Sequence, residues 1–574
     1  MKRKKTVGLS CAHTLQRQAR TLLIVAVFFA GTILFAQDRD NAGTKPSFAN
    51  GSPGAGLLNQ PTNSNFNLKA DQPGSIRFWG SEAADLFSRE ILESYAGVLR
   101  KNYVSEPGGE YPPGFLHASP IPQGWSKTFW TRDGGTFLRE LVHWGNFEHA
   151  KLTAQFLMTQ VDRNEDGFFS YPEYFSKRER GSGTELDGTS SIIIGVVLLW
   201  ERLPESDPFR KRLYEFLHLD CSPIRYLQHQ LEKAPLIAGS GEFGAGCGIS
   251  GLYYNVVGNN LAMYALMSAA GMEEQAGHRK AADVLRHDAH KLRDNIERYL
   301  VAEDGSWIWC IDPGTLKPKS AVVNAEINRG FGGLNGPACM FSDALGFDPL
   351  KSGWPGVAHS LKTFDKLLSV PSRRAALEKY GIWTQFDTFR GGSSSSPSYG
   401  DGYAAQTMLL FDKLDLAEKN IDWTATSTFQ PIAEYKVTRE SPYFFYEQNY
   451  TPDAVGKMPL TEGCGALNLV GVSEQLKVAR LIFGVDDTSP SEVKIIPRLP
   501  SSWKGAEATN WPILTSRGLV RADMRLEREG NGCRFQIKIH ADQAIPQLAV
   551  RLPVGLGHKW YQKKNVTFAE IAAH

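Results

Sequence analysis

The 574-residue chain lacks the motifs of several large protein classes. Its seven cysteines include no Cys-x-x-Cys pair, so neither a zinc ribbon nor a dithiol centre is indicated. It has no Gly-Lys-Ser phosphate loop and no Cys/His nucleophile arrangement. No basic cluster occurs outside the N-terminal segment, and the formal net charge is only +2. We therefore predict no nucleic-acid partner, no cofactor and no catalytic metal.

Long hydrophobic runs are equally scarce, and the only one occupies residues 22–36. It follows a basic stretch without acidic residues and is short for a membrane span, which is typical of a signal peptide. We predict that residues 1–37 are a cleaved signal, with an uncleaved anchor as the alternative. The mature protein is then exported, periplasmic or extracellular, without stable membrane association. Export would permit disulfide bonds, whose pairing the cysteine spacing leaves open.

The rest of the chain divides into three stretches of different composition. Residues 38–75 are rich in Asn, Ser, Gly and Pro, which predicts a disordered linker. Residues 76–485 repeat apolar side chains at helical spacing, and residues 486–574 alternate apolar and polar side chains as short strands do. We predict twelve helices in six hairpins, followed by a small C-terminal β domain. The predicted helices are 81–101, 133–144, 147–160, 185–202, 208–233, 251–270, 273–299, 337–346, 359–379, 401–414, 417–429 and 463–483.

An aromatic loop opens the second predicted helix with Trp130, Arg132 and Asp133. Asp133 is placed to cap that helix, which is the structural explanation. Capping does not account for the other two residues. An exposed Trp is a platform for the face of a sugar, and an Arg-Asp pair offers donors and acceptors to vicinal hydroxyls. We therefore interpret the three residues as a binding motif.

A second acidic opening, Glu185-Leu-Asp187-Gly188, begins the fourth predicted helix. Either carboxylate could simply complement the helix dipole. Two acid-Gly openings on alternate helices nevertheless indicate one shared end of a barrel. We predict that Glu185 and Asp187 contribute to the same binding site.

Two further glutamates are distinguished by their surroundings. Glu242 lies in the segment Gly-Ser-Gly-Glu-Phe-Gly, whose glycines allow close approach to a ligand, and Glu447 lies in the aromatic segment Tyr-Phe-Phe-Tyr-Glu-Gln-Asn-Tyr. Splitting an acetal without a metal requires one carboxylic acid to protonate the leaving oxygen and one carboxylate to activate water or attack carbon. Glu242 and Glu447 are our candidates for this pair. Glu462 is the main rival of Glu447, unless it only caps the twelfth helix.

Residues 162–173 match a calcium loop, with acidic or amide side chains at positions 1, 3 and 5, glycine at position 6 and Glu173 at position 12. Phe169 at position 8 and Pro172 before the last ligand depart from that pattern. A hairpin turn built on Asn164-Glu-Asp-Gly explains the same residues, and it is the interpretation we favour.

The order of these motifs resembles that of the six-hairpin glycosidases, in particular the glucoamylase-like enzymes of family 15. The resemblance covers roughly residues 78–484, with loose individual motifs in a specific order. Around Glu242 the chain departs from the family, which usually has Trp before a Glu-Glu pair. That departure leaves the sugar and the linkage open. The shared order is Trp130-x-Arg132-Asp133-Gly134, an Asp-Gly-Phe loop, Glu185-Leu-Asp187-Gly188-Thr189, an acid before the sixth helix, and Glu447-Gln448 with Pro459-Leu460 before the twelfth.

The resemblance implies an (α/α)6 barrel with a pocket built by the loops at one end. It also implies an exo-acting, inverting hydrolase of oligo- or polysaccharides, with Glu242 as general acid and Glu447 as catalytic base. Trp130, Arg132 and Asp133 would contact the terminal sugar.

The same barrel is also used by polysaccharide lyases and by relatives that only bind glycans, so the fold does not settle the function. A lyase needs a Tyr or His base and a basic cleft, for which Arg132 and Arg329 are thin support. A glycan-binding protein would keep the Trp and Arg contacts and dispense with one carboxylate. Both remain alternatives to hydrolysis.

Overall fold

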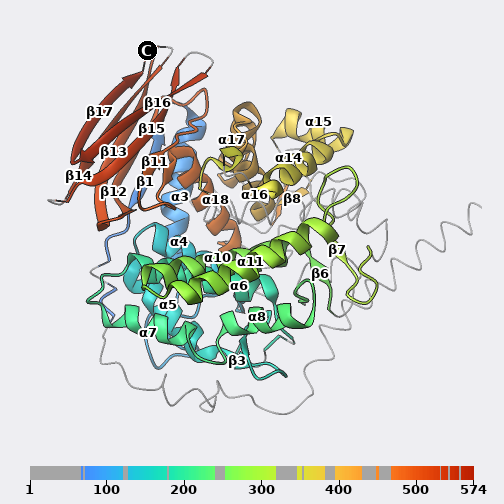
Figure 1. Cartoon of the computed structure of the whole chain (residues 1–574). Helices are drawn as coiled ribbons and strands as arrows, with labels where there is room; N and C mark the ends of the chain where they lie inside the picture. Colours follow the sequence, from blue (N-terminus) through green and yellow to red (C-terminus); the bar gives the residue numbers. More distant parts are fainter. Residues whose placement is uncertain are drawn as a thin grey trace, which may run out of the picture. The chain divides into compact units, whose positions relative to one another are not determined.

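The computed structural model describes residues 66–68, 71–120, 127–177, 180–181, 183–239, 252–318, 346–351, 354–381, 395–429, 448–450, 467–530, 532–540, 543–554 and 557–573. These residues contain thirteen α-helices and two larger β-sheets (Figure 1). No helix in this part of the chain is both long and apolar enough to cross a membrane.

Five helices that are buried on nearly all sides form the inner ring of a barrel. α18 packs on α4, α4 on α6, α6 on α10, and α16 on α18. A helix enclosed all round needs apolar or small side chains on every face, and α6 supplies them with the run Ile-Ile-Ile-Gly-Val-Val-Leu-Leu-Trp. The predicted eighth helix, residues 337–346, lies outside the described residues except for Gly346. The five inner helices are α4 (Thr131–His143), α6 (Leu186–Arg202), α10 (Val256–Gln275), α16 (Ser398–Leu410) and α18 (Leu469–Phe483).

The remaining helices, which precede or separate the inner ones in the chain, form the outer layer. They are amphipathic: α11, for example, buries only five of its 21 residues. α5 packs on α4, α7 on α6, α11 on α10 and α17 on α16. This alternation of inner and outer helices is the predicted (α/α)6 barrel. The outer helices are α3 (Glu82–Lys101), α5 (Phe147–Gln160), α7 (Pro208–Leu217), α8 (Pro223–Lys233), α11 (Arg279–Tyr299), α14 (Pro355–Leu368), α15 (Pro371–Tyr380) and α17 (Leu414–Thr428).

A buried ion pair ties α4 to α18. Arg480 donates to Glu140 through Nε (3.0 Å to Oε2) and Nη2 (2.7 Å to Oε1), and Trp144 Nε1 donates to Oε2 (3.2 Å). Two hydrogen bonds from the guanidinium and one from the indole satisfy the carboxylate, as a buried charge requires. Both residues lie in the later turns of their helices, so the pair holds the C-terminal parts of α4 and α18 together.

Proline divides two of the predicted outer helices. The segment 208–233 forms α7 and α8, because Pro223 starts a new helix whose N-terminus the Ser222 side chain caps. The segment 359–379 forms parts of α14 and α15, with Pro371 as the first residue of the second. The prediction of a single continuous helix is wrong in both places.

The boundary between α10 and α11 also differs from the prediction. α10 starts at Val256 and continues to Gln275, beyond the predicted end at residue 270. α11 starts at Arg279 rather than at residue 273, because Gly277 adopts a positive φ of 85° between the two helices.

The β domain consists of two sheets, with strand orders β1-β12-β13-β14-β17 and β10-β11-β15-β16 (Figure 1). β1 precedes the barrel in the chain, yet it pairs antiparallel with β12, from Ser75 opposite Thr509 to Trp79 opposite Gly505. The chain therefore contributes to this sheet both before and after it forms the barrel. The strands are β1 (Ser75–Trp79), β10 (Val485–Asp486), β11 (Val493–Ile495), β12 (Gly505–Thr515), β13 (Gly518–Glu529), β14 (Gly532–Ile539), β15 (Ile545–Val554), β16 (Gly557–Val566) and β17 (Phe568–Ala573).

An aromatic cluster joins this sheet to the barrel. Phe78 on β1, Phe87 on α3 and Trp503 are each fully buried, and their ring centroids lie 5.0–5.8 Å apart. Burial of three large aromatic rings stabilises the junction through the hydrophobic effect and through tilted ring contacts.

The end of the predicted linker makes specific contacts with the barrel. Asp71 Oδ2 accepts hydrogen bonds from the backbone N–H groups of Glu148 (2.9 Å) and His149 (3.0 Å) in the first turn of α5. The Gly74 N–H donates to the carbonyl of Trp144 (2.7 Å). The part of the linker before residue 66 lies outside the described residues.

Candidate active site

The N-terminal ends of α4 and α6 lie together and carry five of the residues expected to bind the ligand. A short sheet, β2 (Phe129–Trp130) paired with β5 (Tyr174–Phe175), leads into α4. It brings the Trp130 ring to 5.2 Å from the ring of Tyr174, measured between centroids. Two aromatic rings therefore border the start of α4.

Arg132 stands between two carboxylates at this end of the barrel. Its Nε lies 3.4 Å from Asp133 Oδ1, and its Nη1 lies 3.9 Å from Asp187 Oδ2. The side chains of Arg132, Asp133 and Asp187 are 9%, 5% and 7% exposed, respectively. Both carboxylates lie in the first turn of a helix, where the helix dipole favours negative charge. The arrangement presents charged donors and acceptors from two helices at one place.

The structure does not use Asp133 or Glu185 as a helix cap. α4 begins at Thr131 after Trp130, and α6 begins at Leu186 after Glu185, and neither preceding residue makes a side-chain capping hydrogen bond. Asp133 is the third residue of α4, inside its first turn. The capping explanation considered for Asp133 is therefore wrong.

Glu185 is fully buried and contacts Thr131. Its Oε2 lies 2.7 Å from Thr131 Oγ1, which also lies 2.7 Å from the carbonyl oxygen of Pro172. A hydroxyl has one proton, and a carbonyl only accepts. If Thr131 donates to Pro172, the carboxyl of Glu185 must donate to Thr131, and it must be protonated to do so.

Electrostatics favour this protonated form. Burial raises the pKa of Glu185 well above its ordinary value, and the negative charge of Asp187 raises it further, against a smaller opposing effect of Arg132. These effects shift the carboxyl toward its protonated form. Its contact with Thr131 links the start of α6 to the start of α4.

Gly188 allows the two helix ends to approach this closely. A Cβ atom at position 188 would lie 2.4 Å from Thr131 Oγ1 and 2.7 Å from Glu185 Oε2. Such distances are too short for any side chain, so the acid-Gly order of the motif has a steric cause. The glycine makes room for the hydrogen bond between α4 and α6.

The predicted acid and base lie outside the described residues, as does the rival Glu462. The segment that carries Glu242 leaves and re-enters the described part of the chain beside α6. Gly239 and Tyr253 exchange backbone hydrogen bonds (3.2 and 3.3 Å), and a Cβ at position 239 would lie 2.8 Å from the Leu186 side chain. Both ends of this segment are therefore anchored next to the cluster around Asp187.

Glu447 directly precedes β9 (Gln448–Tyr450) in the chain. β9 pairs antiparallel with β8 (Ser395–Pro397), which leads straight into α16. The strand after Glu447 thus lies at the N-terminal end of another inner helix.

The sequence motifs did not indicate that Thr131, Glu173 and Tyr174 belong to this site. The Thr131 N–H donates to the Glu173 carbonyl (3.0 Å), and this contact continues the pairing of β2 with β5. A hydroxyl residue between Trp130 and Arg132 was visible in the motif, but its partners lie more than 40 positions away. No local pattern identifies them.

The predicted calcium loop folds as a β-hairpin, as favoured. β3 (Asp162–Arg163) pairs with β4 (Phe169–Ser170), and Asn164 Oδ1 accepts hydrogen bonds from the N–H groups of Asp166 (3.1 Å) and Phe168 (3.0 Å). Two of the would-be calcium ligands are paired with cations. Asp162 pairs with Arg180, and Asp166 lies 2.6 Å from Lys233 Nζ.

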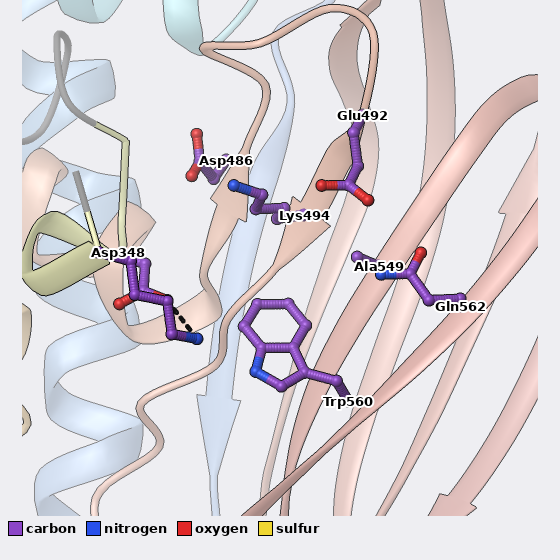
Figure 2. A pocket seen from close by; sticks show the side chains of 8 residues that line it. Asp348, Asp486, Glu492, Lys494, Ala549, Trp560 and Gln562 are labelled. Carbon is purple, nitrogen blue, oxygen red and sulfur yellow. Dashed lines mark ion pairs between the residues drawn. The ribbon is translucent and has the colours of Figure 1, made fainter. Parts of the chain in front are cut away.

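A cavity of about 360 Å³ lies against the β domain, away from these motifs. Figure 2 shows Trp560 in its wall near Asp348 and Lys494. Lys351 Nζ lies 4.8 Å from the centroid of the Trp560 ring and 3.0 Å from Asp348 Oδ2, so the aromatic face and this carboxylate are already paired with a cation. None of the predicted site residues lines this cavity.

No family model matches the sequence, and no curated protein matches it. Solved structures do resemble the chain. An α-L-rhamnosidase from Streptomyces avermitilis, complexed with L-rhamnose, superposes with a TM-score of 0.52 and 12% identity over 88% of this chain and 42% of its own. An α-L-rhamnosidase from Dictyoglumus thermophilum gives 0.51 and 10% over 88% and 49%.

A glycoside hydrolase family 15 glucoamylase from Hypocrea jecorina gives a TM-score of 0.48 and 13% identity over 70% of this chain and 72% of its own. The chain spans about half the length of the rhamnosidases that it matches. At these identities the similarity establishes the fold. The similarity confirms the predicted fold, an (α/α)6 barrel with a C-terminal β domain.

Proposed function

We propose that the protein is an exported glycoside hydrolase that removes terminal sugars with inversion of configuration. The observation that carries the proposal is the cluster of Arg132, Asp133 and Asp187 beside Trp130, at the shared N-terminal end of two inner helices of a six-hairpin barrel. Sugar recognition needs a flat apolar surface and converging donors and acceptors, and this end of the barrel holds both.

In the proposed reaction Glu447 accepts a proton from water as the water oxygen attacks the anomeric carbon. Glu242 donates its proton to the departing glycosidic oxygen, so one water is added and one bond to oxygen is broken. The second carboxylate acts on the face of the ring opposite to the first, which gives inversion when the two carboxyl groups are about 6.5–9.5 Å apart. The anchoring of both flanking segments beside inner-helix N-termini supports these roles.

Trp130, Arg132, Asp133 and Asp187 bind the terminal sugar in this proposal. The indole packs on one sugar face, while the guanidinium and the two carboxylates bind vicinal hydroxyls. The role that we propose for Glu185 is different, because its carboxyl is fully enclosed and bonded to Thr131. It positions the Trp130–Arg132 segment by fixing the first residue of α4.

The substrate class follows from the polarity of the site and from the structural neighbours. Arg132 is balanced by two carboxylates, so the cluster offers no excess positive charge for a uronate. The solved structures with TM-scores of 0.52 and 0.51 are α-L-rhamnosidases. We therefore propose a neutral terminal sugar and place α-L-rhamnosides first among the candidates. α-Glucosides come next, because the order of the sequence motifs resembles that of the family 15 enzymes.

The test is reducing-sugar release by the purified mature protein from α- and β-linked glucosides, rhamnosides and longer oligosaccharides. Glu242→Gln and Glu447→Gln should each abolish most turnover while circular dichroism and sugar binding stay unchanged. Proton NMR of the first product anomer reports inversion or retention. Full activity in either variant would refute that residue's role.

The same assay separates the alternatives. A lyase would release a product with an ultraviolet-absorbing double bond from a uronate polymer and would consume no water. A glycan-binding protein would bind an oligosaccharide tightly and cleave none of the panel.

A further inference from the structure

Three potential metal ligands meet at the end of the barrel opposite the candidate active site. Glu273 lies near the C-terminus of the inner helix α10, His218 follows the last residue of α7, and His278 precedes the first residue of α11. One ligand atom from each side chain lies within 4.8 Å of the other two. The cluster therefore joins one inner helix to two outer helices, and it contains no residue of the proposed hydrolytic site.

Glu273 is at the centre of this cluster. Its Oε2 lies 3.2 Å from His278 Nδ1 and accepts a hydrogen bond from the Tyr214 hydroxyl (3.0 Å), and its Oε1 contacts His218 Nε2. The Tyr214 hydroxyl also contacts His278 Nδ1. Ligand atoms of a tetrahedral zinc site are roughly 3.3 Å apart, given Zn–N and Zn–O bonds of about 2.0–2.2 Å. The three ligand atoms lie within 4.8 Å of one another, and rotation of the two partly exposed histidine side chains would bring them to that geometry.

The orientation of His218 matches that of a metal ligand. Its Nδ1 lies 2.8 Å from the backbone carbonyl of Tyr214, which can only accept a hydrogen bond, so Nδ1 carries a proton. In the neutral ring Nε2 then presents its lone pair toward Glu273. Histidines that bind metals commonly donate their other N–H to a backbone carbonyl in this way, because that bond fixes the tautomer and the ring direction.

Charge and access favour a cation. The Glu273 side chain is only 6% exposed, and a buried carboxylate requires a positive partner. Among the described residues its ion-pair partners are two histidines, a residue type whose charge, unlike that of lysine or arginine, is not permanent near neutral pH. Their side chains are 34% and 57% exposed, so an ion from solution can reach the ligand nitrogens.

We propose that His218, Glu273 and His278 bind one zinc-class divalent cation that fastens α7, α10 and α11 together. Two imidazole nitrogens and one carboxylate suit Zn²⁺, with water as the fourth ligand, and they suit Ca²⁺ or Mg²⁺ poorly. Tyr214 is not a ligand in this proposal: its hydroxyl donates to Glu273 Oε2 (3.0 Å) and orients the carboxylate. The ion stabilises the fold and takes no part in hydrolysis.

The experiment uses the mature protein after chelation of bound metal and removal of the chelator. Isothermal titration with Zn²⁺ should show one site per chain, and Zn²⁺ should raise the Tm in a saturable manner. His218→Ala and His278→Ala should each weaken zinc binding at least tenfold and remove the Tm shift. Tyr214→Phe, which removes only the orienting hydroxyl, should weaken binding by about tenfold.

Matched control variants come from α11, the helix that begins directly after His278. His287→Ala and His290→Ala remove exposed histidines of α11 that are not part of the cluster, and zinc binding should be unchanged in both. Glu273→Gln keeps the shape of the side chain and removes its charge, so it tests the carboxylate separately from packing. The proposal is overturned if the chelated protein shows no one-to-one zinc binding, or if the two ligand variants bind zinc like the controls. The cluster would then be a set of His–Glu ion pairs.

Discussion

Replacement of Glu185 by glutamine tests whether the hydrogen bond between the starts of α4 and α6 is made by a neutral acid. In the structure the Glu185 carboxyl is fully buried, 2.7 Å from Thr131 Oγ1, and burial with the charge of Asp187 raises its pKa well above the ordinary value. A glutamine side chain has the same shape and can donate to the same hydroxyl. Glu185→Gln should therefore leave the fold and the position of Trp130 unchanged.

The magnitude follows from proton linkage. Between the ordinary glutamate pKa of about 4.3 and the raised pKa of Glu185, the folded protein holds one proton that the unfolded chain has released. Stability from this group is complete below pH 4.3 and decreases as the pH rises, by about 1.4 kcal/mol per pH unit until the folded pKa is reached. The Glu185→Gln variant lacks this dependence. As the pH increases, the free energy of unfolding of the variant should therefore increase relative to that of the wild type by about 1.4 kcal/mol per pH unit.

The assay is urea unfolding followed by tryptophan fluorescence at pH 5, 6 and 7. The difference between the free energies of unfolding of the two proteins does not contain the contributions of Glu90 and Asp422. Burial also raises the pKa values of these two residues, but both proteins contain them. Glu90→Gln, at a buried acid bonded to Thr428, should show a similar slope and leave sugar release unchanged. A wild-type minus variant difference that stays constant across this pH range would refute the neutral Glu185.

Three further outcomes are expected. Gly188→Ala should cost about 1–3 kcal/mol and lower activity, because its Cβ would lie 2.4 Å from a neighbouring oxygen, whereas Gly271→Ala in α10 has nothing within 4 Å and should stabilise by about 0.5–1 kcal/mol in the same urea assay. Arg480→Leu should lower the free energy of unfolding by about 3–5 kcal/mol, since it leaves the Glu140 carboxylate buried without its cation, and a destabilisation under 1 kcal/mol would contradict the pairing. Arg132→Lys should reduce kcat/KM at least tenfold with unchanged unfolding, because a lysine cannot span both carboxylates as the guanidinium does; unaltered kinetics would remove Arg132 from the site.

The helical architecture was predictable because its signals are local. The all-apolar run in α6 and the one-sided pattern in α11 distinguish inner from outer helices within a single stretch of sequence. The predicted helix boundaries were wrong where a proline or a glycine interrupts a helix within a continuous apolar pattern. Pro223 and Pro371 each start a second helix, and Gly277 moves the boundary between two others.

The candidate site was predictable in part for the same reason. Acid-Gly motifs at the starts of alternate helices implied one shared end, and the structure brings Arg132 within reach of both Asp133 and Asp187 there. The roles of Glu242 and Glu447 stay predictions, since both lie outside the described residues. The raised pKa of Glu185 was not predictable, because it depends on complete burial at the packed start of α6, beside a hydroxyl 54 positions away.

The sequence by itself determined the hairpin order of the helices, the positions of the polar motifs at their starts, and the change to β structure near the C-terminus. These features depend on side-chain periodicity and turn residues, which act over a few positions. Only the tertiary structure decided that β1 joins the C-terminal sheet, that Thr131 binds Glu185, and that His218 meets Glu273 across 55 positions. Such contacts arise when packed helices and strands bring distant segments together, and no spacing in the chain records them.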